Sequence, residues 1–436
     1  MDFTHIKNEI KEFDSRVNYR EVQYKRYSTE SIPIMWEENP EWLQEDVENK
    51  NKPDRRLYNH FEKEIVDTKV SFFIGYPVMV SSYNQDEKLN EYIDNFNIEI
   101  NYEDLFAEVT KDASSSGVGG VLLYNDNATP NCIKLNPNEF YVYYHLNEPI
   151  NAIRKYLDEE KILTVEWYDS DTVTQYKSIE GEWVQVAQEL HGFRRVPIIE
   201  VVNNKERQSD YHSACKLIDA YNRLVSDFSN EIESFRLAYM VLENYNATKE
   251  DLAKIRETGA ITTDKEGKVY FLTKTIDTKA FEVMKSVLEK NISRFSGHVS
   301  FAEDTFTGNL TEMAISFKIR PLEQKVSNYE RKFKVFLREF YKTLFTFKTY
   351  LVSFDYRDLT FTFTRNLPIN VKEEVETLVK LGGKLSQETI LGLMSFIDNP
   401  QDEISKLEKE EDEDEEDVSN NGEENLQEEI INEEEN

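Results

Sequence analysis

Apolar residues recur along this chain with two different periods, and the change of period separates helical from strand-forming regions. Residues 1–70 are charged and mainly helical in pattern, with a loop rich in Pro, Glu and Asn at 37–54. Apolar residues at helical spacing predict one helix over 54–69. The elements predicted next are a turn with a strand and then two helices, at 74–82, 86–95 and 102–114.

Residues 117 to about 202 form short runs rich in Val, Ile, Tyr, Trp and Thr, with turn residues between them. Such runs are typical of an antiparallel β region. The glycine-containing run SSSGVGG at 114–120 leads into a strand and does not open a helix. A phosphate-binding loop needs a helix N-terminus at that point, so these glycines indicate a helix end and a turn.

The pattern becomes helical again after a polar loop that ends near residue 210. From His212 to Tyr245 apolar residues alternate at spacings of three and four, which predicts one continuous helix of about 30 residues. A small insert at 246–278 contains a short helix and two strands around Lys-Glu-Gly, read as a hairpin. A second long helix is predicted at 278–297. Its apolar residues are Phe281, Met284, Leu288, Ile292 and Phe295.

A third long helix is predicted at 313–348, with Pro321 inside it as the expected site of a kink. Its apolar stripe is Phe317, Leu322, Val326, Tyr329, Phe333, Phe336, Phe340 and Leu344. An alternating strand at 358–368 and a pair of helices at 371–381 and 386–397 complete the pattern. A single copy would leave the long stripes uncovered, so the pattern predicts identical copies packed side by side in a closed ring.

Charge is unevenly distributed. The formal net charge is −32, and residues 402–436, with 18 Asp or Glu and two Lys, carry about half of it. We expect this acidic tail to be disordered. A protein that grips DNA phosphates needs a basic face, and the overall balance here is the opposite. An acidic surface is compatible with simple solubility and also with a channel that does not hold DNA.

No catalytic motif is present, so we expect no enzymatic activity, cofactor or metal. The sequence lacks a P-loop, HExxH and GxSxG, and its six histidines show no metal-ligand spacing. Two cysteines cannot build a disulfide framework. The longest apolar run, 71–80, is too short to cross a bilayer, and the N-terminus lacks the features of a signal peptide.

Two segments carry a resemblance to a known family. Residues 196–245 contain P-I-I-E-x-x-N-N, then S-D, L-I-D-A-Y-N and S-D-x-x-N-E-x-E-x-F. Residues 288–325 contain a helix, a loop with a G-N-[LV]-[ST] core and a kinked helix that ends R-P-L-E-x-K. In this order the chain resembles the portal proteins of tailed bacteriophages of Gram-positive hosts. The resemblance holds from about 55 to 400 and is weak at both ends.

The resemblance implies an α+β, mainly helical portal fold with long stem helices, a mixed α/β wing, a small α/β clip and a helical crown. The implied regions are the wing at 1–210, to which 345–368 returns, the stem at 211–245 and 279–298, the clip at 246–278, the tunnel loop at 299–312, the kinked helix at 313–344, the crown at 369–401 and the tail at 402–436. We expect stem packing through Leu217, Tyr221, Leu224, Phe228, Ile232 and Phe235.

A portal subunit implies a ring, typically a dodecamer, at one capsid vertex of the virion, assembled in the host cytoplasm. The implied partners are the terminase large subunit, a head-completion adaptor, the major capsid and scaffolding proteins, and double-stranded DNA that passes without sequence-specific binding. The DNA-facing tunnel-loop residues would be Thr305, Phe306, Thr307, Gly308, Asn309, Leu310 and Thr311, with Pro321 as a hinge.

Two other functions are compatible with parts of the pattern. Another oligomeric phage structural protein, such as an adaptor or scaffold, would explain the long helices and the absent chemistry. It would not explain the β-rich region or the insert between two helices. A nuclease or hydrolase with a diffuse site would require metal-dependent activity, for which the sequence offers no residues.

Overall fold

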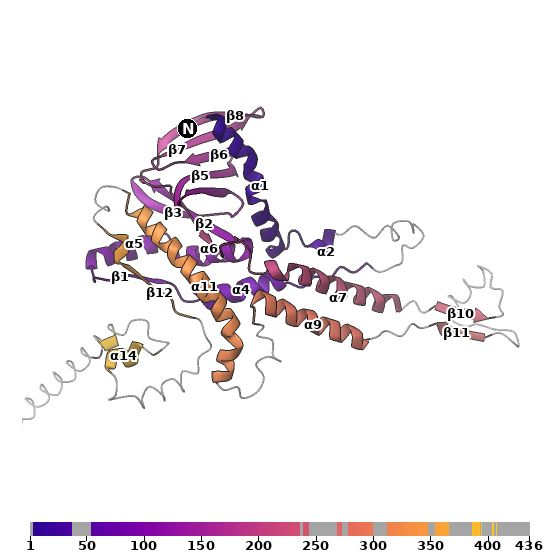
Figure 1. The fold of residues 1–436 in the computed structure, drawn as a ribbon. Coiled ribbons are helices and arrows are strands. Elements are labelled where there is room, and N and C mark those ends of the chain that lie inside the picture. The colour runs from indigo at the N-terminus through magenta and orange to yellow at the C-terminus, as the bar shows by residue number, and fades with distance from the viewer. Residues whose placement is uncertain are drawn as a thin grey trace, which may run out of the picture. The chain divides into compact units, whose positions relative to one another are not determined.

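The computed structural model describes residues 3–36, 54–235, 239–243, 268–272, 278–299, 312–347, 354–365, 386–392, 394, 403–404 and 407. The chain divides into two units, Met1–Phe363 and Thr364–Asn436. In the second unit the structure describes helix α14 (Gln387–Gly392), which falls within the helix predicted at 386–397. The predicted helix at 371–381 and the tail lie outside the described residues. All elements below belong to the first unit (Figure 1).

The predicted antiparallel β region is confirmed and consists of two sheets. A three-stranded sheet has the order β3-β2-β9, and a five-stranded sheet has the order β4-β5-β6-β7-β8, with every pairing antiparallel. The strands are β2 (Val118–Asp126), β3 (Thr129–Leu135), β4 (Phe140–His145), β5 (Glu148–Leu157), β6 (Leu163–Tyr168), β7 (Thr172–Ile179), β8 (Glu182–Leu190) and β9 (Ile198–Val202).

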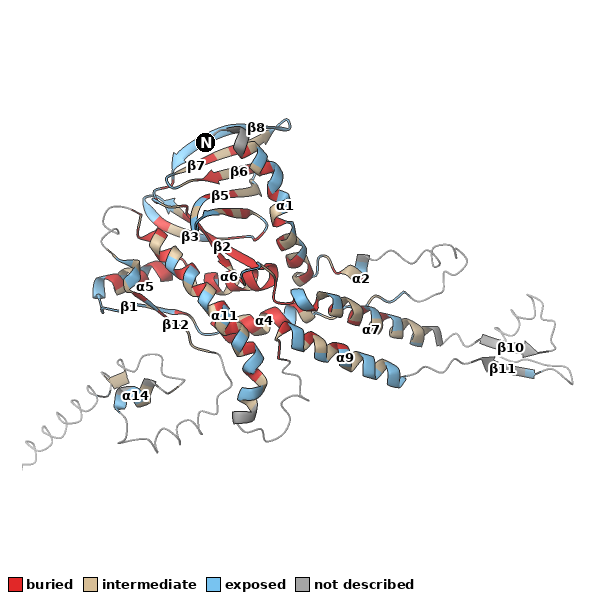
Figure 2. Ribbon diagram, in the orientation of Figure 1, coloured by how far each residue is buried: buried red, intermediate tan, exposed pale blue. Residues whose placement is uncertain are grey.

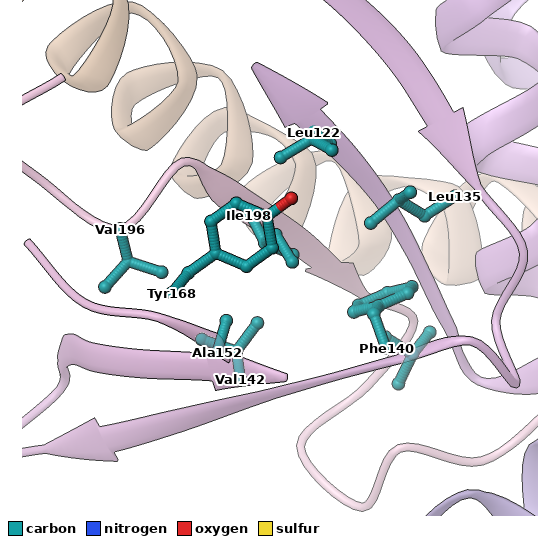
Figure 3. Packing of buried hydrophobic residues seen from close by; sticks show 9 residues of the cluster. Leu122, Leu135, Phe140, Val142, Ala152, Tyr168, Val196 and Ile198 are labelled. Carbon is teal, nitrogen blue, oxygen red and sulfur yellow. The ribbon is translucent and has the colours of Figure 1, made fainter. Parts of the chain in front are cut away.

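Buried apolar side chains fill the space between the two sheets. Figure 3 shows Leu122, Leu135 and Ile198 of the smaller sheet lying near Phe140, Val142, Ala152 and Tyr168 of the larger one. Helix α1 (Phe3–Tyr27) covers the other face of the larger sheet. Its residues Ile6, Ile10, Phe13 and Val17 form a helical stripe that packs on Ile153, Val165, Trp167 and Tyr176.

The glycines before β2 have the predicted structural role. Helix α6 (Tyr102–Ser116) ends at Gly117, whose φ of 89° is left-handed and whose N–H bonds to the carbonyl of Ala113. Such a conformation favours glycine. Gly120 sits against the Phe140 ring, which a side chain at this position would overlap. The run is therefore a helix end and a close packing point.

Helix α11 (Glu312–Leu344) is the central element of an aromatic core. Its stripe residues Phe333, Phe336 and Phe340 meet Phe106 of α6, and Tyr329 and Phe333 meet Phe73 of α4 (Phe61–Ile74). Figure 2 shows burial concentrated where these helices meet β2. The expectation that this stripe needs a second copy for cover was wrong, because the same chain buries it from Leu322 onward. Phe317 is 61% exposed.

The remaining elements of this region agree with the predicted pattern in type and order, although several boundaries differ by some residues. Helix α5 (Glu87–Glu99) follows β1 (Met79–Ser82), which pairs with β12 (Leu359–Thr362). In β12 Leu359 and Phe361 are buried and the threonines are exposed, as the alternation predicted. Helix α4 begins at Phe61 and not at 54. The segment before it is extended because its backbone bonds to a neighbouring helix, described below.

The predicted helix from 212 to 245 is wrong in its second half. A 3₁₀ turn η1 (His212–Ala214) leads into α7 (Cys215–Phe235), and Tyr239–Glu243 is a strand, β10. Strand β10 pairs with β11 (Lys268–Leu272). Within the described residues, β11 therefore pairs with a strand that comes before the predicted insert at 246–278. The run AITTD, predicted as the other strand of a hairpin, lies outside the described residues. Helix α9 (Thr278–Ser296) agrees with the prediction.

Candidate functional site

Helices α7 and α9 pack against each other along their inner faces. Leu288 and Ile292 of α9 are buried in a cluster with Ile218 and Tyr221 of α7 and Ile65 of α4. Farther along the pair, the rings of Phe228 and Phe281 are stacked, with centroids 3.7 Å apart and planes 11° apart. The apolar stripes of the two helices thus face each other within one chain, which corrects the expectation that only sister copies could cover them.

The six predicted stem-packing residues occupy different positions on this helix pair. Tyr221 is buried, Leu217 and Leu224 pack at the edge of the inner cluster, and Phe228 stacks on α9. Ile232 is 47% exposed, and the side chain of Phe235 lies outside what the structure describes. The periodicity identified the inner face for four of them. It could not show which neighbouring element covers that face.

Helix α9 has a second apolar face that the sequence reading did not separate from the first. Val283, Met284 and Val287 are 65%, 49% and 45% exposed. Together with Lys279 and Ala280 they line a shallow hollow, here called the outer patch. The spacing 280, 283, 284, 287 is that of one helical stripe. Figure 2 shows exposed residues predominating at the N-terminal end of α9. A contiguous apolar stripe exposed on a helix often marks a surface that contacts another chain.

A buried ionic cluster lies where the helix pair joins the rest of the unit. The Asp210 carboxylate is 2.8 Å from the Lys69 ammonium group and 2.9 Å from that of Lys325. It also accepts hydrogen bonds from the hydroxyl of Ser114 and, at 3.1 Å, from the Asn203 amide. Burial alone would raise the pKa of Asp210, but the two lysines outweigh it and hold this pKa well below its usual range. We call this group the Asp210 cluster.

The Asp210 cluster connects elements that are distant in sequence. Lys69 of α4 also lies 3.9 Å from the centre of the Tyr329 ring on α11. Lys325 of α11 donates to the carbonyl of Ser296 at the end of α9, at 2.7 Å. Burial lowers the pKa of Lys69 to about 8, against the attraction of Asp210. The cluster therefore holds α4, α6, α9 and α11 together through charged groups with little access to water.

A second ion network joins the start of α7 to α1 and α4. Arg26 lies 2.6 Å from Glu62 and 2.8 Å from Asp219, and its side chain is almost fully buried. The hydroxyl oxygen of Tyr211 lies 2.7 and 2.8 Å from the carbonyl oxygens of Gln23 and Ser115, which share its single proton as acceptors. Paired charges of this kind resist rearrangement, since removing one partner leaves the other buried and uncompensated. The base of the helix pair is thus rigidly connected to the unit.

The predicted tunnel-loop residues, Thr305 to Thr311, lie outside the described residues. Pro321 lies inside α11, as predicted, and Figure 1 shows this helix changing direction along its length. A proline within a helix removes one backbone hydrogen bond and is a common cause of such a bend. Arg320, beside it, is exposed. Whether Pro321 acts as a hinge stays a prediction.

The structure offers little catalytic chemistry within the described residues. Among them no three His, Cys, Asp or Glu side chains are grouped to hold a metal ion. Burial raises the pKa of the Cys215 thiol to about 11 and that of Cys132 further still, so both side chains are protonated thiols at neutral pH. None of the described helices is long and apolar enough to cross a membrane.

Comparison with known proteins identifies the family. A model of the family described as "Phage portal protein, SPP1 Gp6-like" matches residues 4–417. The portal protein of Clostridium phage phiCD119 is 25% identical over 397 residues, which cover 82% of this chain and 85% of that protein. The portal protein of Bacillus phage SPP1 is 26% identical over 392 residues, which cover 82% and 76%. The chain is thus a structural protein of a bacteriophage. It belongs to the SPP1 Gp6-like family of phage portal proteins.

Proposed function

We propose that this protein assembles as a closed ring at one capsid vertex, through which DNA enters during packaging and leaves during ejection. Membership of the portal family supports this proposal. The observation on the chain itself that carries it is the outer patch, where three apolar side chains on one helix are about half exposed. A neighbouring copy of the same chain is the occupant that a ring supplies at every position, because each subunit repeats the same contact.

The regions inferred by resemblance would correspond to the described elements with one change, because β10 lies within the range given to the stem and pairs with β11 of the insert. The sheets and α1 would form the wing, to which β12 returns by pairing with β1. Helices α7 and α9 would form the stem, and β10 with β11 would begin the clip that contacts the terminase large subunit and later a head-completion adaptor. The loop at 299–312 would lie nearest the DNA, and 369–401 would form the crown. Capsid and scaffolding proteins would contact the ring from outside.

The excess of acidic over basic residues supports a channel that binds DNA only weakly. Tight binding to a duplex requires several lysines and arginines on one face to neutralise phosphates. This chain has 52 Lys and Arg against 84 Asp and Glu. Many of its basic residues in the described region are committed to carboxylates, as Lys69, Lys325 and Arg26 are. We therefore expect DNA contact to be weak and independent of sequence.

The outer patch provides the test of assembly. Val283→Asp with Val287→Asp should give folded subunits that no longer form rings, since a neighbour would have to bury two charges. Ser286→Asp places one such charge on another side of α9 and should leave rings intact, whereas Val283→Asp alone, which adds the same single charge within the patch, should weaken them. Circular dichroism checks folding, and mass photometry counts subunits. Rings of normal size from the double variant would contradict the assignment of this patch.

Phe228→Asp would place a charge at one of the predicted stem-packing residues, but it tests assembly less directly than the outer patch does. Because Phe228 stacks on Phe281 in the same chain, the charge would first separate α7 from α9. For the tunnel loop, deletion of Thr305 to Asn309 should leave rings intact and impair DNA packaging or retention. Loss of rings in that deletion would contradict the assignment of the loop.

A further inference from the structure

The segment before α4 runs in an extended conformation along α7. Residues 54–60, here called the strap, carry no regular secondary structure, although Leu57 and Tyr58 resemble helix positions in the sequence. The strap approaches α7 through three polar residues of that helix, Asn222, Ser226 and Asn230, which we call the ladder. They are four residues apart and so lie on one side of α7.

The three ladder residues each hydrogen-bond the backbone of one strap residue, and their partners are alternate residues of the strap. The Asn59 N–H donates to Asn222 Oδ1 at 2.8 Å, the Leu57 N–H to Ser226 Oγ at 2.9 Å, and the Arg55 N–H to Asn230 Oδ1 at 2.6 Å. The contact to Arg55 is two-sided, because the Asn230 side-chain amide also donates to the Arg55 carbonyl at 3.2 Å. The single hydroxyl proton of Ser226 has two acceptors, the Asn222 carbonyl of its own helix at 2.7 Å and the Leu57 carbonyl at 3.1 Å.

The match between the two periods explains the register. Four residues of an α-helix advance about 6 Å along the axis, and two residues of an extended chain advance about 6.6 Å. A row at i, i+4 and i+8 on a helix can therefore meet alternate residues of an extended strand over several steps. Strap numbers rise while ladder numbers fall, so the strap runs antiparallel to α7. The ladder thus does for one segment what the edge of a β-sheet does for an added strand.

Burial shows that these contacts are integral to the packing. Asn222 and Ser226 are 2% and 3% exposed, although both are polar. A polar group so buried is costly unless it is hydrogen-bonded, and the strap backbone supplies the bonds. In contrast, the ion pair between Arg55 and Glu233 is largely exposed, with side chains 63% and 39% accessible. Exposed pairs contribute little, so we assign the attachment to the backbone contacts.

The strap also reaches the short helix α2 (Pro33–Trp36). The Arg56 guanidinium donates to the carbonyl of Met35 at 3.1 Å, near the C-terminal end of α2. We propose that the strap is a brace between α7 and α2. Its backbone hydrogen-bonds to the ladder of α7, and these bonds limit how far α7 can move. Because most of the bonds to α7 come from the strap backbone, binding to α7 depends on an extended conformation more than on strap side chains, whereas the Arg56 side chain makes the contact with α2.

Hydrogen exchange resolved to single residues gives the first test. The amides of Leu57 and Asn59 should exchange slowly. The amide of Tyr58, at the position between them, has no hydrogen-bond acceptor among the described residues and should exchange at least tenfold faster. Equal rates for Tyr58 and its two neighbours would overturn the proposal.

Proteolysis gives the second test, because Arg55 and Arg56 are trypsin sites. Ser226→Ala and Asn222→Ala should each speed cleavage after these arginines at least about threefold, since cleavage tracks the open population. Ser226→Ala removes the acceptor of the Leu57 N–H, and Asn222→Ala removes the acceptor of both the backbone N–H and the side-chain amide of Asn59. Ser229→Ala, on the same helix but outside the ladder, is the matched control and should have no effect. The backbone amides of α7 should also exchange hydrogen faster in the ladder variants than in the unmodified protein. Unchanged cleavage, or an equal effect of Ser229→Ala, would refute the brace.

A strap variant keeps the proposal testable if the ladder variants fold poorly. Leu57→Pro removes the N–H that donates to Ser226, whereas Tyr58→Pro removes an N–H outside the ladder. Proline suits an extended segment at both positions. Leu57→Pro should loosen α7 by the same exchange measurement, and Tyr58→Pro should not. Equal behaviour of the two variants would also contradict the proposal.

Discussion

Asp210→Asn should lower the free energy of unfolding strongly, although it hardly changes the shape of the side chain. The substitution keeps the shape of the side chain and removes the charge between Lys69 and Lys325. The side chains of Asp210 and Lys69 are only 3% and 1% exposed, so solvent cannot replace the lost partner. Removing one member of a buried ion pair costs about 3–5 kcal/mol. We expect a loss of this size, because Lys69 then has no carboxylate partner among the described residues.

Thermal unfolding at fixed protein concentration measures this loss. With an unfolding entropy of about 2.1 cal/mol/K per residue, a unit spanning Met1–Phe363 should melt about 4–7 °C lower. Fixed concentration matters because assembly itself raises the melting temperature. Glu148→Gln is the control, since Glu148 pairs with Arg195 but is 58% exposed, and the expected loss is under about 1 kcal/mol. Equal shifts for the two variants would refute the reasoning.

Two further predictions concern the Asp210 cluster and the packing between the two sheets. Because the pKa of Asp210 is held low, its contribution to stability is complete above the unfolded-state pKa of about 3.9 and is lost as pH falls below that value. Asp210→Asn should therefore flatten the loss of stability in acid titrations followed by circular dichroism, and an unchanged slope would count against the pairing. Gly120→Ala should cost about 1–3 kcal/mol in denaturant unfolding by overlapping Phe140, and Phe140→Leu should restore part of it. No recovery would contradict this cause.

Local patterns predicted most of the elements in this chain. The runs between 117 and 202 that are rich in β-branched and aromatic residues became strands β2 to β9, and the apolar stripe from Leu322 to Leu344 became the buried face of α11. Such patterns are read correctly because burial on one face imposes the same period on sequence and structure. The glycine at 117 was also read correctly, since a left-handed helix end has few alternatives.

The errors share one physical cause, which is that a local pattern does not reveal its partner. Residues 239–243 continue the helical spacing of α7, but pairing with β11 makes them a strand. Leu57 and Tyr58 fit a helix, but the ladder on α7 holds their backbone extended. For the same reason, the sequence wrongly predicted that the apolar stripes of the long helices are buried only by neighbouring copies. Asp210 and Ser226 lie within the segment that carried the family resemblance, yet only the packing showed what they bind.

The central claim is that copies of this chain close into a ring and cover the outer patch of α9. Electron microscopy of the purified protein, with particle mass measured on the same sample, tests this claim most directly. We predict annular particles of about twelve subunits around an open channel, with Val283 and Val287 facing a neighbouring copy. A monomer that persists at high concentration with its outer patch exposed to solvent would contradict the account.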